Sequence, residues 1–302
     1  MPHLNATLVR AAVTSPFKKA GRSGATVPTD RAVLPAAPID SGRLARYRHI
    51  CGFPESGPLP LTYPHVLGFP LAMRLMAARK FPLPVVGLVH TWIVITAHRT
   101  LDPADLLELT VYAEGLTPHR RGTEVTLVTE ARRAGELVWE SRSGYLSRHA
   151  TDRSTTDGSA TDGASTDATP AAPAPATPAA ELPAVTDWRL PGDLGRRYGA
   201  ASGDRNPIHL YPFTARLFGF PRPIAHGMWT VARCLAEAPR SEEIRRVRAD
   251  FRAPVLLPAT VTYAADATGF QLHGAGRVHL TGTTLAGPGP QPEPAAARDG
   301  RS

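Results

Sequence analysis

Residues 198–230 contain most of the chemistry that this sequence suggests, and they read YGAASGDRNPIHLYPFTARLFGFPRPIAHGMWT. Asp204 and His209 are two potential acid–base groups five residues apart, with Asn206 and Pro207 between them. Partners on one face of a helix are three or four residues apart, so this spacing is wrong for a helix. Pro207 has a fixed backbone and favours an extended Asn206. The sequence therefore predicts a rigid turn that directs a carboxylate and an imidazole to one point.

The same stretch ends at the predicted start of a helix. His226, Gly227 and Met228 follow two prolines and precede an apolar pattern with helical spacing that reaches Ala238. A helix that begins at Gly227 presents free backbone N–H groups and the positive end of its dipole. An acid–base pair beside such a helix end has the components of a site with an oxyanion hole.

The stretch resembles the MaoC-like family of hot-dog-fold hydratases and dehydratases, which includes R-specific enoyl-CoA hydratases. The matching residues are Tyr198, Ser202-Gly203-Asp204, Asn206-Pro207-Ile208-His209, Ala215, Gly219-Phe220 and Ile224-Ala225-His226-Gly227-Met228. The ordered set is specific, whereas an isolated Gly-Asp pair would carry no information. Ala201 departs from the family pattern, because a larger aliphatic residue is common there, and this leaves the size of the pocket open.

The resemblance implies a lyase that reversibly adds water to a trans-2-enoyl-CoA and gives a (3R)-3-hydroxyacyl-CoA. It implies that Asp204 and His209 hold the water and exchange protons, without assigning the acid and the base. The N–H of Gly227 would bind the thioester oxygen, while Asn206 and Ser202 would orient the turn. Further candidates for substrate binding are Tyr198, Phe213, His226, Met228 and Trp229. For His226 the alternative is a structural hydrogen bond, and for the aromatic residues it is core packing.

Two other functions stay open from the residues alone. One is a 3-hydroxyacyl-carrier-protein dehydratase of fatty-acid or polyketide synthesis, which would differ in the thioester carrier. The other is a non-catalytic acyl-thioester-binding protein, in which Asp204 would be an Asx-turn residue and His209 a structural histidine. Turnover that depends on both residues separates an enzyme from a binding protein.

Composition limits the remaining function classes. The 302-residue chain has a net charge of +8 at pH 7, but no run of Lys or Arg exceeds two residues, so no nucleic-acid partner is predicted. Cys51 and Cys234 lie far apart and indicate neither a disulfide framework nor a metal site. We expect no metal and no cofactor beyond the coenzyme A or phosphopantetheine of the substrate. No apolar stretch approaches the ~20 residues of a membrane span, and no signal peptide is evident, so we expect a cytoplasmic protein.

The fold expected is α+β, a double hot-dog with two antiparallel sheets that each wrap around a central helix. Thr151–Ala180 contains no Val, Ile, Leu, Met or aromatic residue, and it is predicted to be a disordered linker. The predicted divisions are an arm (1–35), an N-terminal hot-dog domain without the catalytic turn (36–150), the linker (151–183), a catalytic C-terminal hot-dog domain (184–286) and a tail (287–302). Such a chain mimics a dimer of single hot-dog proteins, and a homodimer of it is possible.

The N-terminal half is predicted to contribute to the site without catalysing. Its central helix is expected at about Pro70–Ala78, followed by strands at Val85–Ala97 and Leu106–Ala113 and by a hairpin that turns at 132–135. We expect this helix and the neighbouring Pro-rich turns to line part of the acyl pocket. A C-terminal half without this partner should expose an apolar face and an unpaired sheet edge.

Overall fold

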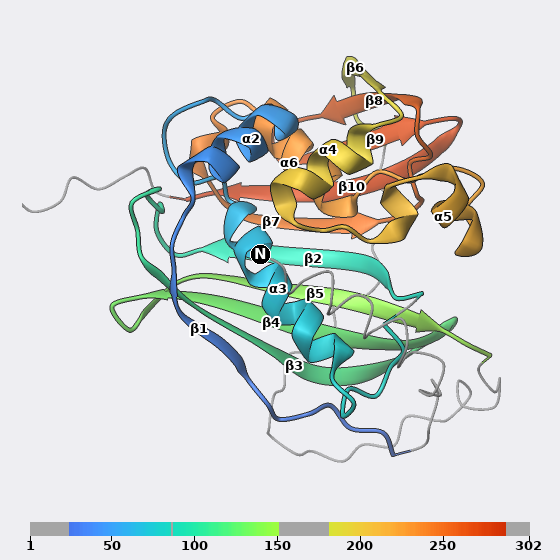
Figure 1. Ribbon diagram of the computed structural model, residues 1–302. Coiled ribbons are helices and arrows are strands. Elements are labelled where there is room, and N and C mark those ends of the chain that lie inside the picture. The colour runs from blue at the N-terminus through green and yellow to red at the C-terminus, as the bar shows by residue number, and fades with distance from the viewer. Residues whose placement is uncertain (1–23, 86, 151–180, 288–302) are drawn as a thin grey trace, which may run out of the picture.

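A computed structural model describes residues 24–85, 87–150 and 181–287. Its strands form one antiparallel sheet of ten strands in the order β1-β3-β4-β5-β2-β7-β10-β9-β8-β6. In Figure 1 the helix 63–77 lies against strands of the N-terminal half, while the helix 41–51 of the same half lies beside the helices of the C-terminal half. The arrangement is the α+β fold that the sequence predicts.

The N-terminal half contains one long central helix against five strands. Its elements are β1 (Ala32–Ala37), α2 (Ser41–Cys51), α3 (Tyr63–Ala77), β2 (Val89–Ala97), β3 (Leu107–His119), β4 (Gly122–Arg133) and β5 (Glu136–Arg148). Asp40 caps α2 by accepting the N–H of Arg43, and Gly52 ends the helix in the left-handed conformation. The central helix packs closely, because a Cβ on Gly68 would meet a methyl group of Thr129 at 2.8 Å.

The C-terminal half repeats this plan with a longer connection before its central helix. Its elements are β6 (Ala184–Leu190), α4 (Leu194–Ser202), the 3-10 turn η3 (Pro207–His209), α5 (Pro212–Leu217), α6 (Gly227–Glu237), the 3-10 turn η4 (Ser241–Glu243), β7 (Ile244–Phe251), β8 (Ala259–Ala265), β9 (Gly269–Gly274) and β10 (Arg277–Ala286). The buried face of helix α6 is mainly apolar, and Val231, Ala232 and Cys234 on it are inaccessible to solvent.

The strand order shows that the two halves are duplicates. Within each half, strands numbered in chain order have the spatial order 1-3-4-5-2, namely β1-β3-β4-β5-β2 and β6-β8-β9-β10-β7. The last strand in each row is the first strand after the central helix of its half. Each half is therefore a hot-dog unit, and the fold is the predicted double hot-dog.

The two predicted sheets are joined edge to edge through β2 and β7. These strands pair antiparallel from Trp92 opposite Asp250 to Thr96 opposite Arg246. Pairing removes two exposed sheet edges at once. This β2–β7 junction, called the seam below, is also buried, since Ile93, Ile95 and Val247 have no exposed surface. Joining of the halves therefore places His90, at the start of β2, beside Phe251, at the end of β7, with their ring centroids 4.7 Å apart.

Several element boundaries differ from those predicted. The central helix of the N-terminal half begins at Tyr63 rather than Pro70, because Pro64 lies in the first turn, where the N–H that it lacks has no intrahelical partner. Pro70 lies inside this helix. The first strand of the seam begins at Val89 rather than Val85. The predicted hairpin is present and longer, with Ala134 and Gly135 both at positive φ, as a two-residue hairpin turn requires.

The predicted arm and linker fall mainly outside the described residues. Strand β1 begins at Ala32, inside the region 1–35 assigned to the arm, and pairs with β3. Residues 1–23 of that arm, residues 151–180 of the linker and residues 288–302 of the tail lie outside the described part. Among the helices that are described, none has the length and apolar character needed to cross a membrane.

Candidate active site

The predicted turn follows α4 and is held by side chains that accept backbone N–H groups. Helix α4 ends at Ser202, and its C-cap residue Gly203 has a φ of 83°. The N–H of Asp204 donates to Ser202 Oγ at 3.1 Å, and the N–H of Asn206 donates to Asp204 Oδ1 at 3.1 Å. Asn206 Oδ1 in turn accepts the N–H of Ile208 at 3.4 Å. Oδ1 of Asp204 therefore forms the Asx turn. The other carboxylate oxygen, Oδ2, accepts none of these backbone N–H groups.

His209 closes the turn from the end of η3. Its side chain is 7% exposed. Nδ1 lies 2.8 Å from the carbonyl oxygen of Ile224, so Nδ1 carries the proton and donates it. The other ring nitrogen, Nε2, then has a free lone pair. The backbone of His209 touches α4, because a Cβ on Gly195 would lie 1.9 Å from its carbonyl oxygen. Only glycine allows this approach.

His226 connects the turn to the start of α6. Its Nε2 lies 3.0 Å from the carbonyl oxygen of Asp204 and 3.8 Å from Oδ2 of the same residue. Its ring stacks on His209 with 3.6 Å between centroids and contacts Tyr198 at 4.8 Å. It is 2% exposed, and its Nδ1 has no hydrogen-bond partner among the described residues. The structural hydrogen bond considered for His226 from the sequence is therefore present.

The pKa values of the acid–base pair shift toward each other. Burial raises the pKa of Asp204, although His209 and the N–H of Asn206 favour its charged form. The Asp204 side chain remains 25% exposed, which limits this effect. Burial lowers the pKa of His209, against the attraction of Asp204 and the carbonyl of Ile224. The His226 pKa is well below its ordinary value, because of burial first and His209 second. Because its pKa is lowered, the His209 imidazole is neutral at neutral pH.

The N-terminus of α6 faces the strand β7. His226 provides no side-chain cap, so the N–H groups of the first turn have no partner within the helix. A Cβ on Gly227 would lie 2.8 Å from the ring of Phe251. Glycine at this position therefore keeps the helix end against the seam, where its positive dipole end and free N–H groups favour a developing oxyanion.

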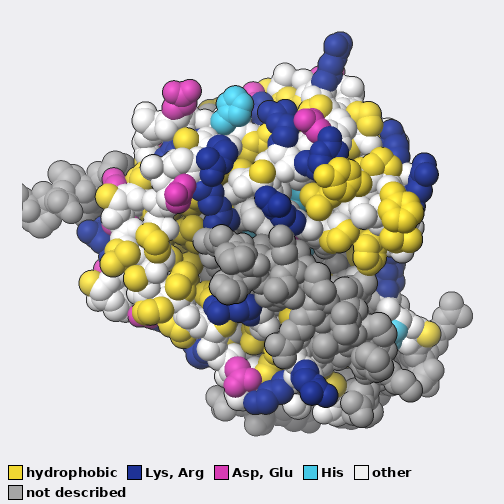
Figure 2. Space-filling model, in the orientation of Figure 1, with side chains coloured by type: hydrophobic (Ala, Val, Ile, Leu, Met, Phe, Trp, Pro, Cys, Tyr) yellow, Lys and Arg dark blue, Asp and Glu magenta, His cyan; other side chains and the backbone are white. Residues whose placement is uncertain are grey.

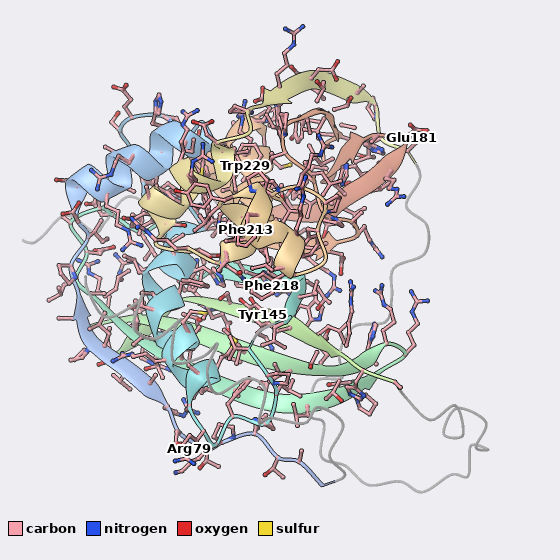
Figure 3. The ribbon with its side chains drawn as sticks, turned by 45° about the vertical axis from the view of Figure 1, so that its right-hand side comes forward. Arg79, Tyr145, Glu181, Phe213, Phe218 and Trp229 are labelled. Atoms are coloured by element: carbon pink, nitrogen blue, oxygen red, sulfur yellow. The ribbon has the colours of Figure 1, made fainter. Side chains whose placement is uncertain are left out.

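Residues of the N-terminal half complete the site, and the sequence analysis did not identify them. Arg43 donates to the carbonyl oxygens of Ala201, at 2.8 Å, and Ser202, which are the last carbonyls of α4. Tyr145 of β5 has a raised pKa, chiefly from burial and then from the charge of Asp204. Its ring stacks on His90 of β2 at 4.5 Å. Figure 3 labels Tyr145 together with Phe213 and Phe218 of the α5 region.

The other candidates for substrate binding lie in different environments. Met228 is 9% exposed, and Trp229 is buried with its Nε1 donating to Ile50 of α2 at 2.8 Å, so it packs between the halves. Phe213 is 73% exposed on α5. It belongs to an apolar patch, visible over α5 at the right of Figure 2, that comprises Tyr211, Phe213, Leu217 and Phe218. Patches of this kind often mark binding surfaces.

The three polar residues also satisfy the geometry of a metal site. Asp204, His209 and His226 each offer one potential ligand atom, and these atoms lie within 4.8 Å of one another. The two histidines each donate one N–H to a backbone carbonyl. A metal would therefore have to use the remaining nitrogens and Oδ2, and two of these atoms, His209 Nε2 and Asp204 Oδ2, are also the ones that acid–base chemistry requires.

The comparisons with known proteins agree with this geometry. Residues 175–286 match the MaoC like domain family. The 3-hydroxyacyl-thioester dehydratase X of Mycobacterium tuberculosis is 35% identical over 264 residues, which cover 85% of this chain and 89% of the relative. The chain belongs to the MaoC-like dehydratase family. The enzyme class predicted from the sequence, a hydro-lyase, is the class of this family.

Solved structures of this family have the same fold. The crystal structure of HtdX from Mycobacterium tuberculosis has a TM-score of 0.70 and 32% identity, covering 85% of this chain and all of that one. A MaoC-like dehydratase from Phytophthora capsici has a TM-score of 0.67 with 18% identity, covering 86% of this chain and 96% of that one. The second likeness concerns the fold alone. Both extend over the two hot-dog halves of this MaoC-like chain.

Proposed function

We propose that this MaoC-like enzyme interconverts a trans-2-enoyl-CoA and a (3R)-3-hydroxyacyl-CoA by addition and removal of water. The observation that supports it most directly is the pairing of Asp204 and His209 in one rigid turn beside the uncapped N-terminus of α6. The relative named a 3-hydroxyacyl-thioester dehydratase supports the thioester class. The R configuration follows from the family resemblance.

In this proposal the water lies between Asp204 Oδ2 and His209 Nε2. His209 takes one proton from the water through its free lone pair while the oxygen bonds to C3 of the enoyl group. Asp204 Oδ2 accepts a hydrogen bond from the O–H that stays on this oxygen, and its negative charge stabilises the imidazolium. The electron pair of the double bond moves toward the thioester oxygen, which the N–H of Gly227 binds. His209 then returns its proton to C2, so one group serves as base and acid in turn.

The remaining polar groups position this pair. The Nδ1–H of His209 donates to Ile224, which fixes the tautomer that leaves Nε2 free. The hydroxyl of Ser202 and the amide of Asn206 hold the turn, and Arg43 holds the carbonyls before it. We propose that the step requires no metal or separate cofactor, because the water is activated by the acid–base pair. Dehydration follows the same path in reverse.

The test is hydration of crotonyl-CoA, followed by the loss of enoyl absorbance. Asp204→Asn and His209→Gln should each lower turnover by at least ~10²-fold, the scale of a general acid–base group, while the melting temperature changes little. Asp193→Asn is the matched control, because its side chain forms no cap hydrogen bond at the start of α4. Near-full turnover in either folded variant would remove the mechanism.

The same assay separates the alternatives. A panel of enoyl thioesters of increasing chain length, offered on coenzyme A and on carrier protein, distinguishes a CoA enzyme from a carrier-protein dehydratase. Wild-type protein that binds acyl thioesters but turns over neither kind would instead be the acyl-thioester-binding protein considered above. Turnover unaffected by a chelator is the expected result for a reaction without metal.

A further inference from the structure

The opposite end of the seam contains a pocket that is related to the active site by the duplication. In the active site, the segment between α4 and α6 meets the end of β7 at Phe251. In the N-terminal half, the corresponding segment between α2 and α3 meets the residues that follow β2 and the start of β7. The two places have equivalent positions in the two hot-dog units. The second place lacks the Asp/His turn.

This pocket has a volume of about 240 Å³ and a mainly apolar lining. Phe53, Leu59, Leu101, Trp139 and Ile244 contribute its apolar walls. Four of these side chains are more than nine-tenths buried, the exception being Phe53. The volume is somewhat below the ~300–1,000 Å³ of sites for drug-sized ligands. A ligand with a short unbranched apolar chain fits such a space.

The polar lining of the pocket is predominantly cationic. It contains Arg48, Arg99 and Arg245 against one carboxylate, that of the exposed Glu242. Arg48 is occupied, because its guanidinium donates to four backbone carbonyls of the segment 54–58. Arg245 donates to Thr100 Oγ1 and to the carbonyl of Glu242, both at 2.6 Å.

Arg99 differs from these two arginines. It is half-buried beside the pocket, and no hydrogen bond or ion pair joins its side chain to any described residue. A guanidinium offers five N–H donors in a planar fork that matches a carboxylate. A partly desolvated guanidinium at the mouth of an apolar pocket therefore favours an amphipathic anion, with its carboxylate on Arg99 and its chain inside.

We propose that this second pocket binds a short-chain monocarboxylate, separately from the thioester in the active site. The carboxylate pairs with Arg99, and Arg245 adds a second positive charge nearby. The apolar chain replaces water against Leu101 and Trp139, and this contribution grows with chain length until the pocket is full. An alcohol of the same length lacks the charge, and an amine has the wrong sign. Both therefore bind more weakly than the acid.

Hexanoate is the probe, titrated into the full-length protein by calorimetry at pH 7.5. The expected result is saturable binding that is at least about tenfold weaker in Arg99→Glu, since a hydrogen-bonded charge pair is lost. Arg246→Glu is the matched control, because Arg246 is exposed on the adjacent strand, does not line the pocket and carries the same change in charge. Hexanol and hexylamine test the head-group requirement.

A second variant locates the chain. Leu101→Trp fills the pocket and should abolish hexanoate binding while crotonyl-CoA turnover continues. Hexanoate that binds equally well to wild type, Arg99→Glu and Leu101→Trp would occupy another place, such as the acyl site, and would overturn the proposal. Absence of saturable binding to the wild-type protein would overturn it too. If Leu101→Trp does not fold, the comparison of Arg99→Glu with Arg246→Glu decides alone.

Discussion

The buried histidines should make this enzyme sensitive to mild acid, and His65 offers the clearest test. His65 lies on α3, is 8% exposed and has a pKa lowered by burial from 6.5 to about 4. Between these values the unfolded chain binds a proton that the folded chain refuses, so the free energy of unfolding decreases as the pH falls. At pH 7.5 this difference in proton binding changes the free energy of unfolding by nearly zero. At pH 5.5 it amounts to about 1.4 kcal/mol, at 1.36 kcal/mol per pKa unit.

The measurement is denaturant unfolding of wild type and His65→Gln at pH 7.5 and 5.5. Wild type should lose about 1.4 kcal/mol more than the variant between the two pH values, a loss for which His65 alone is responsible. His49→Gln is the control, since His49 is exposed on α2 and folding changes its surroundings little. Equal pH dependence in wild type and His65→Gln would mean that the folded protein protonates His65, and the reasoning would be refuted.

Three further predictions concern the site and the joined halves. Gly195→Ala should destabilise the protein by about 1–3 kcal/mol and lower turnover, because the new Cβ collides with the carbonyl of His209. Gly192→Ala is the control, since a Cβ there has its nearest neighbour at 3.8 Å, and it should change neither thermal unfolding nor turnover. The kcat/KM should stay flat from pH 7 to 8.5 and fall only on further acidification, because burial lowers the pKa of His209, the proposed base, below its ordinary value. A kcat/KM that decreases as the pH rises from 6 to 8 would instead require a protonated His209. A fragment of residues 184–287 alone should aggregate and show little turnover, since β7 loses its pairing with β2. A fragment that is monodisperse in gel filtration and fully active would contradict this.

The conformation of the turn that contains Asp204 and His209 could be predicted from the residues next to it in the sequence. Pro207 and the polar side chains around it determine their own hydrogen bonds within a few residues, so the extended Asn206 and the helix start at Gly227 follow from the sequence. The central helix of the N-terminal half shows where local rules mislead. Pro70 has the pattern of a helix start, yet the helix begins at Tyr63 and includes it.

The particular residues that the N-terminal half brings to the site could not be predicted from local patterns. His90 and Tyr145 come to the site because β2 pairs with both β5 and β7, and that register is set by strands distant in sequence. Arg43 reaches the end of α4 across more than 150 residues of chain. The Pro-rich segment before α3 lines the pocket at the other end of the seam. Pairing geometry, rather than residue type, determines these positions.

The two ends of the seam also show how one hot-dog unit remained folded without the catalytic turn. In the C-terminal half, side-chain oxygens of Ser202, Asp204 and Asn206 accept backbone N–H groups and hold the turn. In the N-terminal half, the buried guanidinium of Arg48 does the reverse and donates to four carbonyls between Pro54 and Pro58. Both solutions satisfy backbone groups that would otherwise be buried without partners. Only the first leaves a carboxylate oxygen free beside an imidazole. The two ends of the seam therefore differ in which side chains satisfy the backbone, and this difference leaves the proposed acid–base pair in the C-terminal half alone.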